Sequence, residues 1–263
     1  MRFAFVNQQR HDAQPKLAGT CLACARPMVP KCGKFKVWHW AHKVGAACDP
    51  WWENETEWHR AWKALFPDHW QEVIQHSADG EKHIADVKTE REWVIEFQHS
   101  SIDPEERRAR EAFYRQLVWV VDGTRRKKDP EKFFKAWTEG ASVADTSLVR
   151  VRRVRVDDCV LLREWSDSAA PVLLDFCDGQ GLVWLLPSLL PGFAYVAGIL
   201  RGAFVEIHRK GVSQTGPDFG EFVRGLRGLV TDFEAQQARA GSRSLADPFN
   251  PIRSSRGRSR RRF

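Results

Sequence analysis

The order of predicted elements between residues 51 and 140 constrains the fold more than any other feature of the sequence. Helical and strand-like patterns alternate there in the order α, β, β, β, α, β, α. Two helices begin at Asp-Pro pairs, because aspartate caps a helix and proline fits its first turn. We expect a helix at 53–66, strands at 70–76, 82–89, 92–98 and 117–122, and helices that begin at Pro104 and Pro130. This order predicts an α+β fold.

Composition separates three further segments from this central region. Residues 1–50 are rich in Cys, His, Trp, Gly and Pro with little periodicity, which is typical of a small loop-rich module that needs a staple. Residues 145–238 are expected to be β-rich, with a closing helix, and 239–263 a disordered basic tail. Strands of the β-rich domain are predicted at 149–156, 159–165, 171–177, 182–186 and 203–208. The central domain is then 51–140.

The cysteine content and the N-terminus bear on the compartment. Six cysteines in 263 residues are too sparse for a disulfide scaffold, and the first residues contain no apolar signal core. We therefore expect a cytoplasmic protein without a membrane partner. Residues 179–200 contain no charge and are long enough to cross a bilayer. Their four glycines and two prolines favour buried strands over a membrane helix.

A zinc site is predicted in the N-terminal module. Cys21 and Cys24 are separated by two residues, and after fourteen more come His39 and His42. Two thiolates and two imidazoles are a ligand set that structural zinc prefers, and either Cys32 or Cys48 could replace a histidine. The alternative is a pair of buried cysteines with unrelated histidines. A base deaminase is excluded because no histidine is followed two residues later by glutamate.

Two carboxylates are expected to meet in the central region. Side chains alternate along a strand, so Glu96 and Gln98 share one face of the strand at 92–98. If this strand pairs with the one before it through a short turn, Asp86 lies close to Glu96. Two converging carboxylates repel each other unless a cation compensates them, and Mg²⁺ or Mn²⁺ prefers such oxygen ligands.

The predicted helix before these strands carries Glu55, His59 and Lys63 at spacings of four residues, hence on one stripe. For this helix alone, a solvated face with ordinary ion pairs explains the pattern. Together with Asp86 and Glu96, the stripe is expected to face the same cleft.

These residues occur in the same order as in the competence protein CoiA family, which the chain resembles over about residues 18–125. The family is placed among the PD-(D/E)XK nucleases. The resemblance therefore implies a restriction-endonuclease-like αβββαβ core, with Glu55, Asp86 and Glu96 as metal ligands. The matching motifs are Cys21-x2-Cys24, His39-Trp-Ala-His42-Lys43, Glu55-x3-His59-x3-Lys63, His83-Ile-Ala-Asp86-Val87, Glu96-Phe97-Gln98-x-Ser100-x-Ile102, Arg110 and Tyr114.

The function that the resemblance implies is a Mg²⁺- or Mn²⁺-dependent nuclease acting on single- or double-stranded DNA, in uptake, processing or recombination. Gln98 stands where most such nucleases have lysine, and glutamine can orient a water but carries no charge. Lys63 or Arg110 is expected to neutralise phosphate. One alternative is a non-catalytic DNA-binding accessory protein with a degenerate nuclease site. Another is a zinc nuclease centred on His39 and His42.

Aromatic and basic residues are unevenly distributed. Nine of the twelve tryptophans lie between Trp38 and Trp119, where they either fill a small core or stack unpaired bases beside Lys34, Lys36 and Lys43. Residues 248–263 contain six arginines and no acid, so most of the net charge of +7 lies in this tail. Such a tail favours salt-sensitive attraction to DNA phosphates.

Overall fold

The computed structural model describes residues 1–45, 48–51, 55–145, 150–179, 181–186, 188, 190–210 and 218–246, without the side chains of 240–246. The chain forms two compact units, residues 1–219 and 220–263. The fold is mixed α+β, as predicted. Its order of elements across residues 57–139 is also the predicted one: helix, three strands, helix, strand, helix.

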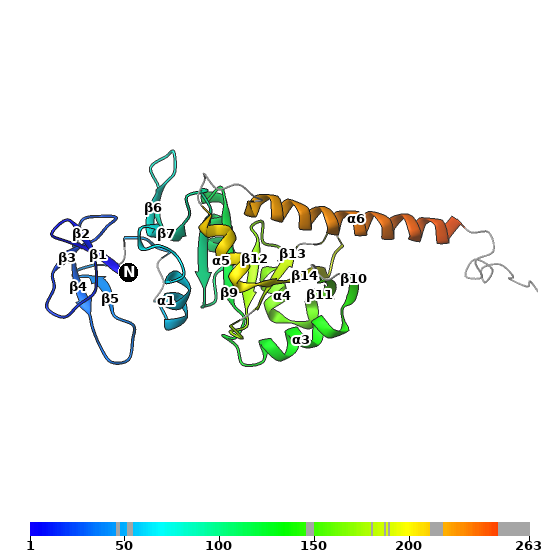
Figure 1. The fold of residues 1–263 in the computed structure, drawn as a ribbon, viewed down its shortest axis with the longest axis horizontal. Helices are drawn as coiled ribbons and strands as arrows, with labels where there is room; N and C mark the ends of the chain where they lie inside the picture. The colour runs from blue at the N-terminus through cyan, green and yellow to red at the C-terminus, as the bar shows by residue number, and fades with distance from the viewer. Residues whose placement is uncertain are drawn as a thin grey trace, which may run out of the picture. The chain divides into compact units, whose positions relative to one another are not determined.

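A nine-stranded sheet organises the first unit (Figure 1). Its strand order is β10-β11-β14-β13-β12-β9-β8-β7-β6. Neighbours β8, β9 and β12 are parallel, and the other pairs are antiparallel. The strands are β6 (Gln71–His76), β7 (Lys82–Lys88), β8 (Val94–Gln98), β9 (Leu117–Asp122), β10 (Ala141–Asp145), β11 (Arg150–Arg155), β12 (Val172–Asp175), β13 (Gly181–Leu186) and β14 (Phe193–Leu200).

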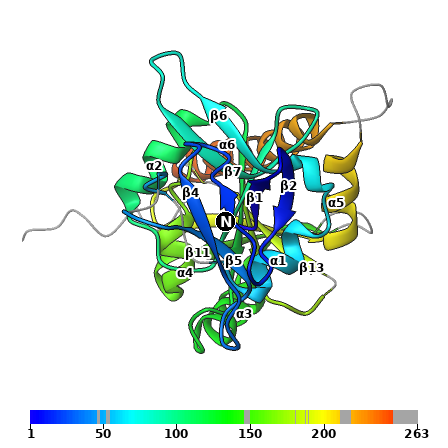
Figure 2. The same ribbon diagram turned by 90° about the vertical axis from the view of Figure 1, so that its left-hand side faces the viewer.

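Helices cover both faces of this sheet, and the sequence of β9 explains why. All six residues of β9 are buried, so its alternating side chains meet a core on each side. On one face Trp119 lies 5.4 Å from Trp165. In Figure 2, α2 and α4 lie on one side of the sheet and α1 and α5 on the other. The helices of this unit are α1 (Glu57–Lys63), α2 (Pro104–Phe113), α3 (Asp129–Glu139), α4 (Val160–Trp165) and α5 (Arg201–Arg209), with 3-10 turns at Asp68–Trp70 and Val156–Asp158.

A second, five-stranded sheet forms the N-terminal module (Figure 1). Its order is β2-β1-β3-β4-β5, and the pairs are antiparallel. The small core contains Trp40, Met28 and Cys21, which are almost fully buried. The strands are β1 (Phe3–Val6), β2 (Gln9–Asp12), β3 (Gly19–Thr20), β4 (Pro27–Lys31) and β5 (His39–His42). Short strands with so few core residues are consistent with a module that needs a staple.

Two predicted strands are helices. Residues 159–165 contain α4, which buries Leu161, Leu162 and Trp165. Residues 203–208 lie in α5, which buries Phe204, Val205 and His208 at helical spacing. Short apolar runs of this length do not distinguish a buried helix from a strand, which is why the prediction was wrong at both places.

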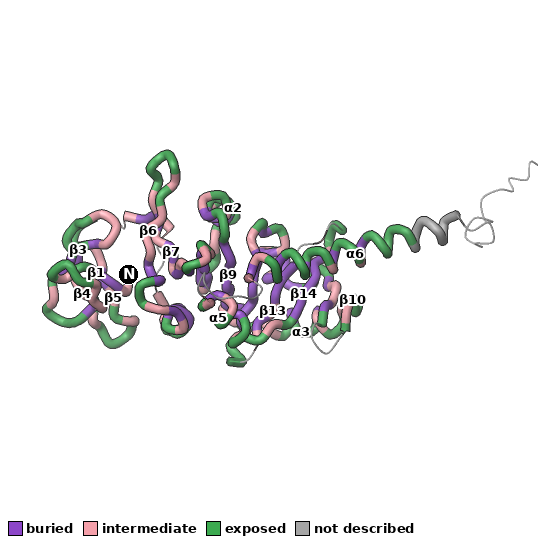
Figure 3. The backbone as a smooth tube through the Cα atoms, turned by 45° about the horizontal axis from the view of Figure 1, so that its top comes forward, coloured by how far each residue is buried: buried purple, intermediate pink, exposed green. Residues whose placement is uncertain are grey.

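The predicted separation of residues 51–140 from 145–238 is not found. β12 pairs in parallel with β9, with Asp175 opposite Asp122, so both segments contribute to one sheet. Figure 3 shows the joined strands as a continuous buried layer. The composition shift at residue 145 is therefore not a domain boundary, because strands on both sides of it belong to the same sheet.

α6 (Phe219–Ala246) contains every described residue of the second unit. Residues 239–246, which were predicted to belong to the disordered tail, are helical. Residues 248–263, with their six arginines, lie outside the described residues. Of the helices in the described part of the chain, none combines the length and apolar composition needed to cross a bilayer, and β13 and β14 occupy most of the uncharged stretch.

Candidate active site and candidate metal centre

Asp86 of β7 and Glu96 of β8 meet where the backbone ladder between their strands ends. Backbone pairing covers Val87 with Ile95 and Lys88 with Val94. At the next pair of residues, Asp86 and Glu96, side-chain carboxylates accept the hydrogen bonds in place of backbone carbonyls. The Asp86 N–H donates to Glu96 Oε1 over 3.2 Å, and Asp86 Oδ2 accepts from the Phe97 N–H over 3.1 Å. Asp86 and Glu96 therefore lie together, as predicted.

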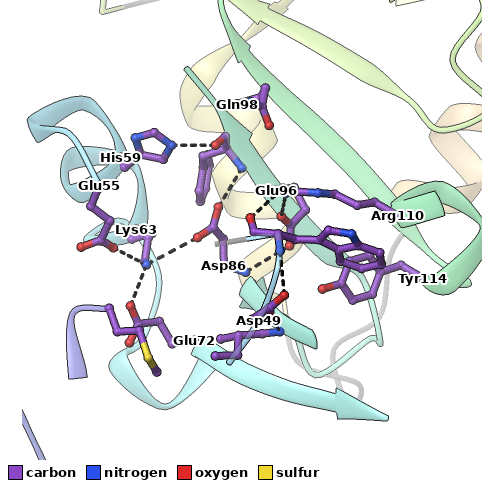
Figure 4. Close-up of a pocket in the computed structure, with 14 residues that line it drawn as sticks. Asp49, Glu55, His59, Lys63, Glu72, Asp86, Glu96, Gln98, Arg110 and Tyr114 are labelled. Carbon is purple, nitrogen blue, oxygen red and sulfur yellow. Dashed lines mark hydrogen bonds and ion pairs between the residues drawn. The ribbon is translucent and has the colours of Figure 1, made fainter. Parts of the chain in front are cut away.

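Lys63, the last residue of α1, supplies positive charge to this cluster (Figure 4). Its side chain is 1% exposed, and its Nζ forms an ion pair with Glu55 and lies 3.3 Å from Glu72 and 3.5 Å from Asp86. Burial disfavours the charged amine, but these carboxylates outweigh burial and raise the pKa of Lys63. Lys63 is thus a permanently charged, enclosed cation. Its amine stabilises the carboxylates and is too buried for the predicted contact with a DNA phosphate.

Two tryptophan indoles fix α1 against the sheet. Trp58 and Trp62 both donate from Nε1 to Asp175 Oδ2, at 2.9 and 2.8 Å, at the end of β12. The third member of the predicted stripe, His59, donates from Nε2 to the Phe97 carbonyl, 2.8 Å away. These contacts hold Lys63 in a defined position relative to β7 and β8.

Glu55 precedes α1, whose N-cap is Thr56, rather than lying within it. Burial would raise the pKa of Glu55, but its ion pairs with Lys63 and Arg60 hold that pKa well below its usual range. The carboxylate is therefore ionised and already paired with two cations. Glu55 is thus paired with Arg60 and Lys63, and among the described residues it belongs to no group of three or more ligand atoms close enough to hold one metal ion.

Glu96 is almost completely buried and differs electrostatically from Glu55. Burial and the nearby Asp86 carboxylate raise the pKa of Glu96 to about 8, although Arg110 Nη1 lies 3.1 Å from Glu96 Oε2 and opposes the shift. Both Glu96 oxygens nevertheless accept hydrogen bonds, from the Asp86 N–H and from Arg110, and these contacts favour the carboxylate form. A divalent cation between Asp86 and Glu96 would favour it further.

Gln98 and two acidic residues complete the cavity. Gln98 is buried and donates from Nε2 to the Ser100 carbonyl, 3.2 Å away. Asp49 and Glu72 were missed by the sequence analysis: Asp49 Oδ2 accepts from the Ile84 N–H over 2.7 Å, and Glu72 Oε2 from the Phe3 N–H over 2.9 Å. No motif distinguishes these two residues in the sequence. The cavity is lined by Met1, Asp49, Trp51, Glu55, His59, Lys63, Glu72, Ile84, Asp86, Glu96, Phe97, Gln98, Arg110 and Tyr114.

A second candidate centre lies in the N-terminal module, where ligand atoms of Cys21, Cys24, His42 and Cys48 all lie within 4.8 Å of one another. Cys21 Sγ is 3.6 Å from Cys48 Sγ, and Cys24 Sγ is 3.2 Å from His42 Nε2. Sulfur ligands of a tetrahedral zinc ion stand about 3.8 Å apart, so the cluster could hold a metal such as zinc. No other such group, including the Glu55, Asp86 and Glu96 set, occurs among the described residues.

The cluster replaces His39 of the predicted ligand set with Cys48. His39 and His42 are three residues apart in β5, so their side chains point to opposite faces of the strand. His39 Nδ1 lies instead 2.9 Å from the Val37 carbonyl. The prediction for His39 was therefore wrong, and Cys48, one of the two expected substitutes, takes its place.

The charge state of the thiols is compatible with metal binding. Burial opposes ionisation of Cys24, yet hydrogen bonds from Arg26 and His42 lower its pKa to about 6. Burial and the neighbouring Cys21 raise the pKa of Cys48 to about 12. A bound divalent cation supplies the charge that lets both sulfurs ionise.

Substitution of Cys48 by serine is expected to remove the metal. Purified wild-type protein should contain about one zinc ion per chain, and the Cys48→Ser variant less than about a tenth of that, because a three-ligand site holds structural zinc weakly. Elemental analysis measures this directly. The matched controls, Cys32→Ser and His39→Gln, should retain full zinc. A zinc content unchanged by Cys48→Ser but lost with His39→Gln would contradict the ligand set.

Comparison with protein-family models, with curated proteins and with solved structures finds no match for this chain. The functional assignment therefore depends on the residues of the cavity and on the chemistry that they allow.

Proposed function

We propose that the chain is a divalent-metal-dependent nuclease that hydrolyses phosphodiester bonds of DNA. The observation that carries the proposal is the meeting of Asp86 and Glu96 in a cavity that also contains Lys63, Gln98 and Arg110. The topology supports it as well. α1, β6, β7, β8, α2 and β9 follow one another in the order that the resemblance implies, with β6 to β8 antiparallel and β9 parallel to β8.

The donor set fits one hydrated cation. Mg²⁺ is commonly held by one or two carboxylates and keeps several waters, and Asp86 and Glu96 provide such a pair. The Asp86 side chain is 25% exposed, so it retains access to solvent beside the buried Glu96. Glu55 contributes indirectly, since it pairs with Lys63, which in turn lies beside Asp86.

The residues of the chain then have distinct roles. A bound Mg²⁺ or Mn²⁺ would polarise a phosphate oxygen and lower the pKa of a bound water. Asp86 is held in position by the Phe97 amide and by Lys63. Arg110 fixes the Glu96 carboxylate, and Gln98 offers an amide that can orient a water by hydrogen bonds. The zinc-type cluster of the N-terminal module has a structural role.

One observation favours the alternative of a non-catalytic DNA-binding protein. Lys63 and Arg110 already compensate several of the buried carboxylates, so the cluster is stable without a divalent ion. In that case the same residues serve only as a scaffold.

Incubation of the protein with labelled single- and double-stranded oligonucleotides separates the two functions. The nuclease predicts cleavage that requires added Mg²⁺ or Mn²⁺. Binding without cleavage under any of these metal conditions would support the non-catalytic protein instead.

A further inference from the structure

The loop at residues 32–38, between β4 and β5, exposes an aromatic ring completely. The Phe35 side chain is 101% exposed, and Lys34 and Lys36 on either side of it are also exposed. Figures 1 and 2 show the loop extending beyond the ends of β4 and β5. A fully exposed phenylalanine makes no contribution to the core. A single exposed apolar residue is common at protein surfaces, and Phe35 is distinguished by the exposed lysine on either side of it.

The surrounding segment is entirely without acidic residues. Residues 13–48 contain six lysines and arginines and no aspartate or glutamate. Within the part of the chain that the structure describes, Lys31, Lys34 and Lys36 form no ion pair with a carboxylate. Their charge is therefore available to an anionic partner.

Contacts at the base of the loop connect it to the acidic cavity. Trp38 Nε1 donates to the Gly33 carbonyl over 3.1 Å, which closes the loop on itself. The Trp38 carbonyl accepts from Arg60 Nη2 over 2.7 Å, and Arg60 pairs with Glu55, a residue of the cavity wall. The loop is thus fastened to the element that positions Lys63.

We propose that this loop binds single-stranded nucleic acid, with an unpaired base stacked on Phe35 and the adjoining phosphates beside Lys34 and Lys36. Every base has a π-face, so such a platform binds without sequence preference, and flanking lysines track the backbone. The inference rests on the proposed function only in that both take DNA as the partner. Binding by the loop requires no catalysis.

The same chemistry argues against a lipid surface as the partner. Membrane-binding segments bury a broad apolar face, usually of several large side chains. Here Phe35 stands between two lysines, and the half-exposed Trp38 indole is turned back to Gly33. One ring with neighbouring cations matches a base and its phosphates better than an acyl layer.

Fluorescence anisotropy of a fluorescein-labelled oligo(dT), in buffer without magnesium and with zinc-loaded full-length protein, tests the proposal. Phe35→Ala is expected to weaken binding about tenfold, within the usual effect of removing one stacked ring, and Phe35→Tyr to restore it. Lys34→Gln with Lys36→Gln should reduce the slope of log affinity against log salt by roughly 1.4, because two phosphate contacts are lost. Phe35→Ala should leave that slope unchanged.

Phe134→Ala is the matched control. Phe134 is a half-exposed phenylalanine beside Lys135 in α3, and its ring packs 4.9 Å from that of Phe176. This variant should bind oligo(dT) like the wild type. Equal affinity of wild type and Phe35→Ala for oligo(dT) would overturn the proposal, as would Phe35-dependent binding to anionic vesicles without binding to oligo(dT). Phe35-dependent binding by a protein that never cleaves DNA would support the loop and reject the nuclease.

Discussion

Replacement of Lys63 by methionine is expected to lower the free energy of unfolding by about 3–5 kcal/mol at neutral pH. The methionine fills most of the volume of the lysine stem but leaves Glu55, Glu72 and Asp86 without their shared cation. Each carboxylate keeps other partners, such as Arg60 for Glu55 and the Phe97 amide for Asp86. These partners limit the loss but do not replace a charge at the centre of the cluster.

Urea unfolding followed by tryptophan fluorescence measures this loss. Lys135→Met is the matched control, because Lys135 is 73% exposed and lies 3.9 Å from Glu139 in a surface pair. Its effect should stay within about 0.5 kcal/mol. An unfolding midpoint of Lys63→Met equal to that of the wild type would contradict the buried ion cluster.

The difference in free energy of unfolding between the wild type and Lys63→Met is also expected to depend on pH. Burial raises the pKa of Glu55, but the opposing effect of Lys63 and Arg60 is larger. The pKa of Glu55 is therefore lower in the folded than in the unfolded state. The stabilisation from this pairing is present above the ordinary glutamate pKa and is lost as the pH falls below it. The wild type and Lys63→Met should therefore converge in stability on acidification.

The pairing of Asp86 with Glu96 could be predicted from sequence because it depends on local features. A short turn between two alternating strands fixes their register, and register alone brings residues 86 and 96 opposite each other. The helix start at Asp103-Pro104 was correct for the same reason, since capping involves neighbouring residues. At Asp129-Pro130 the helix is present, but Asp129 is its first residue and the N-cap is Lys128, so the predicted aspartate cap was wrong there.

Three of the four residues of the zinc-type cluster were predicted from their spacing. Alternation along β5 allows only one of His39 and His42 to belong to the cluster, and the structure selects His42.

The other residues of the cavity and the joining of the strands into one sheet depend on contacts between segments far apart in the sequence, which no local pattern encodes. Glu72 and Asp49 enter the cavity through hydrogen bonds to Phe3 and Ile84, far away in sequence. Lys63 has the periodicity of a solvated helix face, and only the packing of α1 buries it. In the same way, the joining of β12 to β9 depends on a core assembled from segments about fifty residues apart.

Replacement of Asp86 by asparagine is expected to reduce DNA cleavage by about a thousandfold or more. Stabilisation of transition-state charge by a metal ion is worth several kcal/mol, and about 4 kcal/mol corresponds to a thousandfold in rate. Asparagine keeps an oxygen that can accept from the Phe97 amide, so the local fold should survive. It lacks the charge that holds a divalent cation between residues 86 and 96.

Asp79→Asn is the matched control, because Asp79 is an exposed residue in the turn between β6 and β7 and lines no part of the cavity. It should cleave at the wild-type rate. Circular dichroism and unfolding midpoints of both variants establish that any loss is not caused by unfolding.

The most direct test is the initial rate of Mg²⁺-dependent hydrolysis of labelled DNA by wild type, Asp86→Asn and Asp79→Asn, measured side by side at saturating substrate. We predict metal-dependent cleavage by the wild type and by Asp79→Asn, and almost none by Asp86→Asn. Cleavage by Asp86→Asn at the wild-type rate, or no cleavage by the wild type with either Mg²⁺ or Mn²⁺, would contradict a metal-dependent nuclease site built on Asp86 and Glu96.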